Sequence, residues 1–177
     1  MSCYAEIWLR EPEKKILRQI SPTGDETYFP HITLVRPFIP MIDEEAVKRL
    51  IAGICIGKSP PIFTLEGSGS FGQITYVPVT NCKELLQLND ELELTLGPYV
   101  QFAEKLSPTK MLHVTIEVEG EMVPFPKTDL HMFRLTVIKD KKIWFSYDFV
   151  THEILDRFES LDKQRYEQTL ERWKNVS

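Results

Sequence analysis

The chain has 177 residues, of which 42% are hydrophobic and 27% are charged, and its formal net charge is −5 at pH 7. This length and composition are typical of one soluble globular domain with a substantial core. Proteins that follow a long duplex usually carry a basic surface, so the negative charge argues against duplex DNA as a partner. It favours a small anionic ligand or the end of an RNA strand.

The three cysteines, Cys3, Cys55 and Cys82, are scattered along the chain and form no C-x-x-C pair. This usage is typical of a reducing compartment and argues against a disulfide framework or a zinc ribbon. We recognise neither a signal peptide nor an apolar run of about 18 residues. We therefore expect a cytoplasmic protein that has no membrane partner.

The hydrophobic pattern at the start of the chain predicts strands and helices in alternation. A strand over residues 4–9 is followed by a helix whose first turn contains Pro12. A second strand covers residues 31–36. The next helix has Asp43 as its N-cap and stops at Gly57.

The middle of the chain predicts the same kinds of element. Two strands, over residues 61–66 and 73–79, are separated by a glycine-rich turn. A helix follows, with Asn81 and Glu84 in the pattern of a capping box. A further strand covers residues 111–118.

The last third of the chain predicts a loop, a hairpin and a helix. The loop covers residues 119–127, which contain two prolines. Strands over residues 130–138 and 143–150 form the hairpin. The final amphipathic helix covers about residues 159–175, with Tyr166, Leu170 and Trp173 as its apolar stripe.

One short pattern occurs twice in the chain. Residues 31–34 (HITL) and 113–116 (HVTI) both consist of a His, a β-branched residue, a Thr and an aliphatic residue. Because side chains alternate along a strand, each tetrad places its His and Thr on one face and its aliphatic pair on the other. Each tetrad also ends a strand–helix–strand unit, which indicates a duplication. We expect two α+β lobes whose polar strand faces line a shared groove.

Two histidines in one groove allow acid–base chemistry without a metal. A neutral His takes a proton from the nucleophile, and a protonated His gives one to the leaving oxygen. Thr33 and Thr115 lie on the same face as His31 and His113 and can donate to a non-bridging oxygen of a bound anion. This set suits in-line displacement at phosphorus, and we expect neither a metal nor a cofactor.

A single His-x-Thr strand is more often structural than functional, so the repetition carries the interpretation. The other two histidines, His131 and His152, lack the Thr partner, and we interpret them as structural or surface residues. The segment 67–72 (GSGSFG) matches G-x-G-x-x-G, but a strand rather than a helix follows it. A hairpin turn is therefore the better interpretation of the glycines.

Residues 30–38 (PHITLVRPF) and 112–116 (LHVTI) resemble the two signature motifs of the 2H (two-histidine) phosphoesterase superfamily. The most similar branch is that of the 2'-5' RNA ligase or LigT-like proteins, which include cyclic nucleotide phosphodiesterases. The resemblance implies one bilobal, pseudo-symmetric α+β domain over residues 1–177. Each lobe is then an antiparallel sheet with helices on its outer face, and the active site lies in the cleft between the lobes.

The resemblance also implies the roles of the tetrad residues. His31 and His113 are then the general acid–base pair, and Thr33 and Thr115 hold the phosphate. The implied activities are opening 2',3'-cyclic phosphates to 2'-phosphates and forming or cleaving 2'-5' RNA linkages. The expected partners are RNA ends or small cyclic nucleotides, and we expect a monomer.

Further candidates for substrate binding lie near the predicted groove. Arg36 is a candidate phosphate ligand, although alternation puts it opposite His31 unless a bulge before Pro37 changes its direction. Glu117, on the same face as Thr115, repels a phosphate unless it points past the groove or pairs with Lys110. Four aromatic residues are candidates to stack on a base, although each alone is more often a core residue: Phe29, Phe38, Phe71 and Tyr76.

The alternative function is a non-catalytic RNA- or nucleotide-binding module on the same fold. Binding alone does not need both histidines, so the two intact tetrads favour an enzyme.

Overall fold

The computed structural model describes residues 2–10, 13–20, 30–103, 110–116 and 123–176. The expectations for Phe29 and Glu117 lie outside these residues. The first half of the described chain contains β1 (Cys3–Trp8), α1 (Glu13–Ile20), β2 (His31–Pro40), α2 (Glu44–Cys55), β3 (Ile62–Gly67), β4 (Gly69–Phe71) and β5 (Ile74–Thr80). The second half contains α3 (Lys83–Leu96), β6 (Val100–Phe102), β7 (His113–Ile116), β8 (Phe125–His131), β9 (Arg134–Lys139), β10 (Lys142–Asp148), β11 (Ile154–Leu155), α4 (Arg157–Leu161) and α5 (Lys163–Val176).

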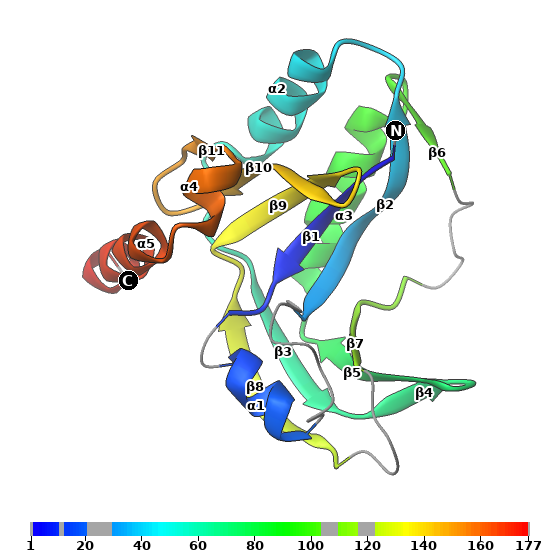
Figure 1. Ribbon diagram of the computed structural model, residues 1–177, viewed down its shortest axis with the longest axis vertical. Helices are drawn as coiled ribbons and strands as arrows, with labels where there is room; N and C mark the ends of the chain where they lie inside the picture. Colours follow the sequence, from blue (N-terminus) through cyan, green and yellow to red (C-terminus); the bar gives the residue numbers. More distant parts are fainter. Residues whose placement is uncertain (1, 11–12, 21–29, 104–109, 117–122, 177) are drawn as a thin grey trace.

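The strands form an antiparallel sheet whose main order is β11-β10-β9-β1-β2-β7-β5-β3-β8 (Figure 1). Strand β4 extends it beside β5, and β6 pairs with β2. The predicted α+β class is therefore confirmed. The two tetrad strands, β2 and β7, are neighbours at the centre. Each pairs antiparallel with the first strand of its own unit, β2 with β1 and β7 with β5.

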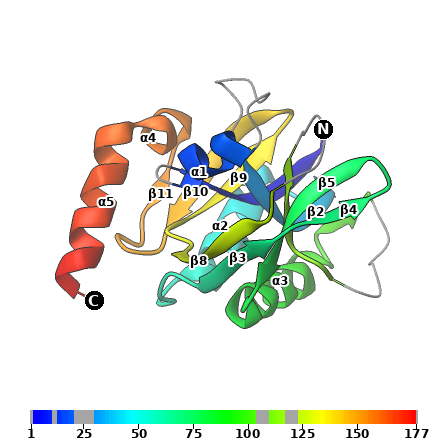
Figure 2. The same cartoon turned by 90° about the horizontal axis from the view of Figure 1, so that it is seen from below.

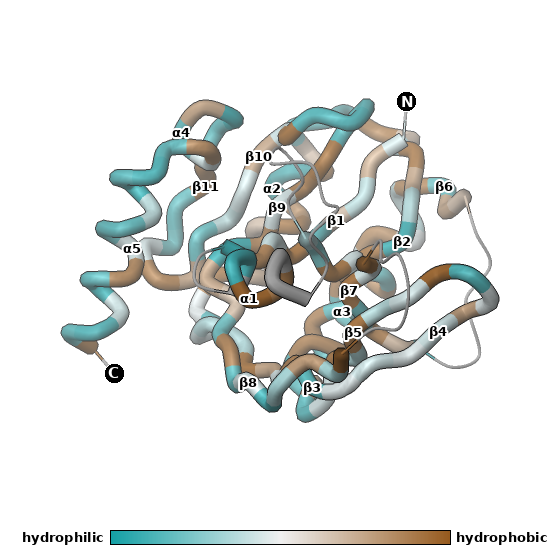
Figure 3. Tube along the Cα trace, turned by 60° about the horizontal axis from the view of Figure 1, so that its bottom comes forward, coloured by the Kyte–Doolittle hydropathy of each residue, from teal (hydrophilic) through white to brown (hydrophobic). Residues whose placement is uncertain are grey.

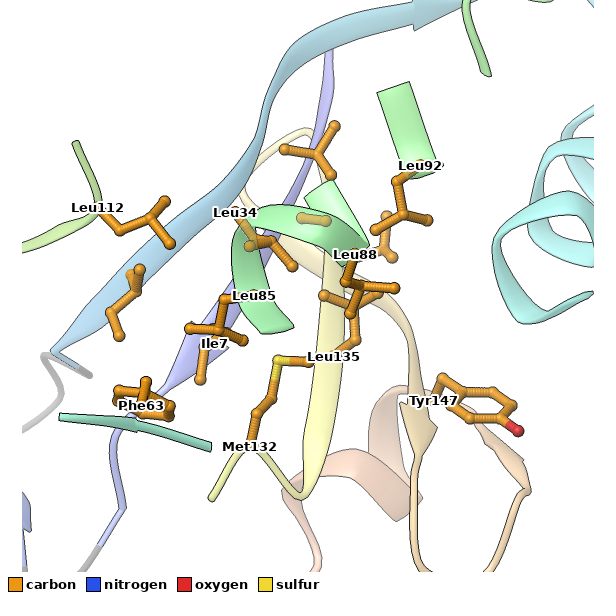
Figure 4. Close-up of a cluster of buried hydrophobic side chains, with 14 of the residues drawn as sticks. Ile7, Leu34, Phe63, Leu85, Leu88, Leu92, Leu112, Met132, Leu135 and Tyr147 are labelled. Atoms are coloured by element: carbon orange, nitrogen blue, oxygen red, sulfur yellow. The ribbon is translucent and has the colours of Figure 1, made fainter. Parts of the chain in front are cut away.

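Helix α3 covers the apolar face of this sheet. Its side chains Leu85, Leu88 and Leu92 are buried and lie against Ile7 and Leu34 of the two N-terminal strands (Figure 4). Helix α2 packs against α3 and adds buried residues of its own to the core. In Figure 2, α3 lies below the strands and α1 above them. The hydrophobic side chains of α3 therefore pack on one face of the sheet, and the opposite face is left for polar groups.

The start of α2 follows the prediction, but the start of α3 does not. The Asp43 carboxylate caps α2 by accepting from the Ala46 amide. The predicted capping box of α3 is absent among the described contacts, because Asn81 adopts a φ of +46° and Cys82 is the N-cap. The Glu84 carboxylate instead accepts a hydrogen bond of 2.9 Å from the Ile62 amide. It therefore ties the helix to β3.

Strand β8 corrects the predicted loop over residues 119–127 and the predicted strand over 130–138. It begins at Phe125 and pairs with β3 along its length, and a separate strand, β9, begins at Arg134. The prediction was wrong because Pro126 has no backbone N–H to donate to a neighbouring strand, which argues against a strand in the sequence. Because β8 is the last strand in the sheet order, a proline is tolerated there.

The C-terminal helix is two helices rather than one. Helix α4 has a capping box in which Asp156 and Glu159 each accept the other's amide at 2.9 Å. It ends at Asp162, whose carboxylate accepts from the Gln164 amide and starts α5. Only Thr169 of α5 is fully buried, and the helix is largely hydrophilic in Figure 3. None of the described helices is long and apolar enough to cross a membrane.

Candidate active site

Both tetrads show the alternation that their sequences predict. In β2, Ile32 and Leu34 are buried, whereas His31 is half-buried and Thr33 is exposed. The same order holds in β7, where the two aliphatic residues are buried and the His and Thr are half-buried. The apolar pairs face the core, and the His and Thr of each tetrad face the other side of the sheet.

The strand register brings the two tetrads together. Ile32 of β2 lies across from Val114 of β7 in an antiparallel pair. One further step in each direction places His31 opposite Thr115, and Thr33 opposite His113. Residues opposite one another on neighbouring strands share a face, with Cβ atoms about 5 Å apart. Residues two positions apart along a strand are about 7 Å apart, so these four residues form a compact rectangle of alternating His and Thr.

His31 lies beside a buried carboxylate. Its Nε2 atom is 3.1 Å from Oε1 of Glu6, whose side chain is only 6% exposed. Glu6 belongs to β1, where it is the register partner of Thr33, and its other oxygen accepts a hydrogen bond of 2.8 Å from Trp8 Nε1. Burial raises the pKa of Glu6, and the neighbouring His31 and the Trp8 hydrogen bond oppose that rise in part. Glu6 thus compensates positive charge on His31.

The sequence interpretation missed Glu6. Its one signal is a charged residue inside the otherwise apolar strand segment 3–9 (CYAEIWL). A carboxylate in such a run needs a polar partner when the strand is buried. The partner is identified only by the pairing of β1 with β2.

His113 has a different partner. Its Nδ1 atom lies 3.2 Å from the backbone carbonyl oxygen of Met111. A carbonyl oxygen only accepts hydrogen bonds, so this contact favours the tautomer with the proton on Nδ1. The Nε2 atom of the neutral ring then carries the lone pair. The two histidines therefore differ in their partners, which are a backbone carbonyl for His113 and a buried carboxylate for His31.

An aromatic pair adjoins His113. The rings of Phe71 and Tyr76 are stacked with centroids 4.4 Å apart, and they lie 5.6 Å and 5.4 Å from the His113 ring. Tyr76 is the register partner of Thr115, and Phe71 is 48% exposed at the end of β4. The structure thus places both of these candidate base-stacking residues at the tetrads.

The glycines of the segment 67–72 serve this hairpin, as the turn interpretation predicts. Gly67 and Gly72 have φ values of +81° and +59°, which glycine adopts without strain. Gly69 is the register partner of Tyr76, and a Cβ atom there would collide with the tyrosine ring. Glycine at this position lets the aromatic ring lie flat over the neighbouring strand.

The prediction for Phe38 is wrong. Its ring is fully buried and packs edge-on against Phe102 with centroids 6.3 Å apart, so it has no exposed face for a base. The prediction for Arg36 is also wrong. Its guanidinium lies 4.1 Å from the Phe102 ring centroid and 3.5 Å from Glu93 of α3, which covers the apolar side of β2. The register of β1 and β2 does shift in this region, but Arg36 remains on the helix side, away from the tetrads.

Lys110, whose pairing with Glu117 is one of the two predicted alternatives, lies 4.0 Å from Glu93, the same carboxylate that lies beside Arg36. Its ammonium group contacts Asp90 at 2.6 Å and also bonds the side chain of Asn89, which in turn donates to the backbone oxygen of Leu34. This network connects the start of β7 with α3 and β2. Within the described parts of the chain, no group of three or more His, Cys, Asp or Glu side chains is arranged to hold a metal ion.

The fold and the paired tetrads are those of a two-histidine phosphoesterase. The sequence profile of the 2'-5' RNA ligase superfamily matches residues 9–133, a range that includes both tetrads. The chain therefore belongs to the 2'-5' RNA ligase superfamily, whose members are phosphodiesterases or ligases. No curated protein is significantly similar to it in sequence.

Solved structures support the fold. The phosphodiesterase (PDE) domain of MHV ns2 has a TM-score of 0.53 and 13% sequence identity, and the alignment covers 78% of this chain and 99% of that one. LigT of E. coli in its apo form has a TM-score of 0.45 and 15% identity, over 86% of this chain and 91% of the other. At these identities the likeness concerns the fold alone, and the LigT score is too low to add to it.

Proposed function

We propose that the chain is a phosphoesterase that opens 2',3'-cyclic phosphates of RNA ends or small nucleotides, or that forms or cleaves 2'-5' linkages. The observation that carries this proposal is the β2–β7 register, which sets two His-Thr pairs on one sheet face in inverted order. A phosphate centred among the four residues has a histidine on each side. In-line displacement needs this arrangement, because the attacking and leaving oxygens lie on opposite sides of phosphorus.

The different partners of the two histidines suggest their roles. In hydrolysis of a 2',3'-cyclic phosphate, Nε2 of His113 takes a proton from water as the new P–O bond forms. The P–O bond to the 3'-oxygen breaks, and the His31 imidazolium protonates that oxygen, so a 2'-phosphate is produced. Glu6, 3.1 Å from His31, compensates the imidazolium charge before the transfer. Thr33 and Thr115 donate to the non-bridging oxygens.

The aromatic pair makes the His113 side of the site different from the His31 side. Phe71 and Tyr76 lie beside His113 and present an exposed ring face to the solvent side of the sheet. Stacking on a base is tolerant of base identity and typically contributes about 1–3 kcal/mol per base. We infer that the base of the substrate lies over this pair, on the His113 side. The leaving oxygen then lies toward His31.

The direct test is turnover by the purified full chain after treatment with EDTA. The substrates are nucleoside 2',3'-cyclic phosphates and a 2'-5'-linked dinucleotide. We expect 2'-phosphate products from the cyclic substrates and no loss of rate in the presence of chelator. Binding of the substrates without turnover would instead indicate the non-catalytic nucleotide-binding module, and loss of activity with EDTA would contradict the metal-free mechanism.

Glu6→Gln is expected to lower activity and to raise stability at neutral and alkaline pH. The glutamine keeps the shape but cannot balance the His31 imidazolium, so kcat should fall at least about 10-fold, as for the carboxylate that supports a catalytic histidine. Since burial raises the pKa of Glu6, the folded state holds this proton more tightly than the unfolded state. The folding free energy gained from this tighter proton binding is present at low pH and is lost as the pH rises through the pKa of Glu6 in the folded state.

The neutral glutamine avoids that loss, so the melting temperature of the Glu6→Gln variant should exceed that of wild type at pH 8 and approach it near pH 4. Glu45, which is 60% exposed on α2, provides the matched control. Glu45→Gln should change neither kcat nor the pH dependence of melting. A Glu6→Gln variant with wild-type kcat would show that this carboxylate does not support His31.

A further inference from the structure

A cavity lined by two arginine side chains lies near the tetrads. Its volume is about 140 Å³, and its walls include Trp8, Arg10, His131, Arg134 and Tyr166. These residues come from the end of β1 and the segment just after it, the end of β8, the start of β9, and α5. The acid–base chemistry proposed above uses none of them.

Trp8 joins this cavity to the site. It is the register partner of His31 across β1 and β2, so the two side chains lie on the same sheet face. The β1–β9 register pairs Glu6 with Thr136, and two residues further along both strands it places Trp8 across from Arg134. Two strand spacings separate His31 from Arg134, which is about 10 Å. A ligand on the tetrads therefore has the cavity within reach.

The cavity holds more positive than negative charge. Arg134 pairs with the buried carboxylate of Asp148 at 2.9 Å. Arg10 donates 2.7 Å to the backbone oxygen of Ser160 and lies 4.3 Å from the centroid of the Tyr166 ring. Among the residues that the structure describes, no carboxylate lies within ion-pair distance of Arg10. The guanidinium groups of Arg10 and Arg134 thus have one buried carboxylate, that of Asp148, to balance their two charges.

Such an arrangement favours an anionic ligand. Burial and the neighbouring Arg134 lower the pKa of Arg10 to about 10, so Arg10 remains protonated at neutral pH. A buried charge without a counter-ion is costly, and a bound anion relieves that cost. The planar guanidinium offers paired donors that match the oxygens of a phosphate.

We propose that this cavity binds a second phosphate group of the substrate, one nucleotide away from the phosphate that reacts between His31 and His113. The site rests on the proposed phosphoesterase function. Arg10 binds the phosphate directly, and Trp8 lies between the two phosphate positions. The preferred substrates are then RNA ends or 5'-phosphorylated nucleotides rather than nucleosides that carry only the cyclic phosphate.

The test compares two substrates that differ in one group, adenosine 2',3'-cyclic phosphate and its 5'-phosphorylated form. In wild type, kcat/KM should be about 10–100-fold higher for the phosphorylated substrate, mainly through a lower KM, as expected for a charge-assisted contact. Arg10→Met should reduce this ratio to about one, and Arg10→Lys should leave an intermediate ratio. Arg49→Met, which removes an exposed arginine from α2, should keep the wild-type ratio.

A purely structural Arg10 gives a different result. If Arg10 only holds Ser160 and Tyr166, Arg10→Met lowers the melting temperature and affects both substrates equally, so the ratio stays at its wild-type value. That outcome, or a wild-type ratio of one, would overturn the proposal. Arg10→Lys keeps the charge and the reach to Ser160, so it decides the question if the methionine variant does not fold.

Failure of the phosphoesterase function can be separated from failure of this site. If wild type turns over neither substrate, calorimetric titration with inorganic pyrophosphate tests the cavity without catalysis. Affinity at least about 10-fold higher for wild type than for the Arg10 variants would support the anion site. Equal affinity in wild type and both variants would refute it.

Discussion

Replacing either His31 or His113 by alanine is expected to lower kcat on 2',3'-cyclic phosphates by about 10²–10⁴-fold, the range of general acid–base catalysis. The two side chains lie on neighbouring strands, diagonally across the His-Thr rectangle set by the Ile32–Val114 pair. In the proposed mechanism each acts on a different oxygen of the same phosphorus. Loss of either one leaves a displacement in which bond formation and bond cleavage are no longer both assisted.

Residues that act as a unit have non-additive effects, so the double variant should be little slower than either single variant. His152 provides a control outside the site, because it is exposed in a turn beyond β10 and contacts Tyr147. It has a φ of +59°, which asparagine tolerates, so the control is His152→Asn. The measurement is the single-turnover rate of each variant on a 2',3'-cyclic mononucleotide, compared with that of wild type. Wild-type rates in either tetrad variant would exclude the acid–base pair.

Replacing Asp148 by asparagine is expected to cost about 3–5 kcal/mol of folding free energy, the range for breaking a buried ion pair. Asp148 is 1% exposed. One carboxylate oxygen accepts from Arg134 at 2.9 Å and from the Thr169 hydroxyl at 2.6 Å. The other accepts from the backbone amides of Val150 and Thr151, each at 3.0 Å. The carboxylate thus holds β9, α5 and the turn after β10 at one point.

The variant would leave Arg134 without its carboxylate beside the already unbalanced Arg10. A loss of this size is a large part of the stability of a typical domain. Asp140, exposed in the β9–β10 turn with a φ of +49°, provides the control, since asparagine also adopts that conformation. Asp140→Asn should stay within about 0.5 kcal/mol of wild type in denaturant titration. A similarly small effect for Asp148→Asn would show that solvent reaches this pair.

The tetrads were predictable from sequence because their signal is local. Alternation over four residues fixes which side chains share a face, and the repeat identifies the two strands as equivalents. The repeated strand–helix–strand order was also predictable, but which strand pairs with each tetrad was not. The roles of His31, His113, Thr33 and Thr115 remain predictions for the experiments above.

Features that depend on pairing were not predictable. Glu6 becomes part of the site only because β1 pairs with β2 in one register, which puts its carboxylate beside His31. Strand β8 is recognisable only once its edge position is known, since that position is what tolerates Pro126.

The central pairing of β2 and β7 has a consequence for substrate orientation. Two similar strands that run antiparallel are related by an approximate twofold rotation, which exchanges His31 with His113 and Thr33 with Thr115. On their own, these four residues would accept a phosphodiester in either chain direction. Glu6 and Trp8 adjoin one histidine, whereas Phe71 and Tyr76 adjoin the other. These neighbours lie outside the two tetrads and differ between the two units, so we expect them to break the symmetry and to select one polarity of a bound strand.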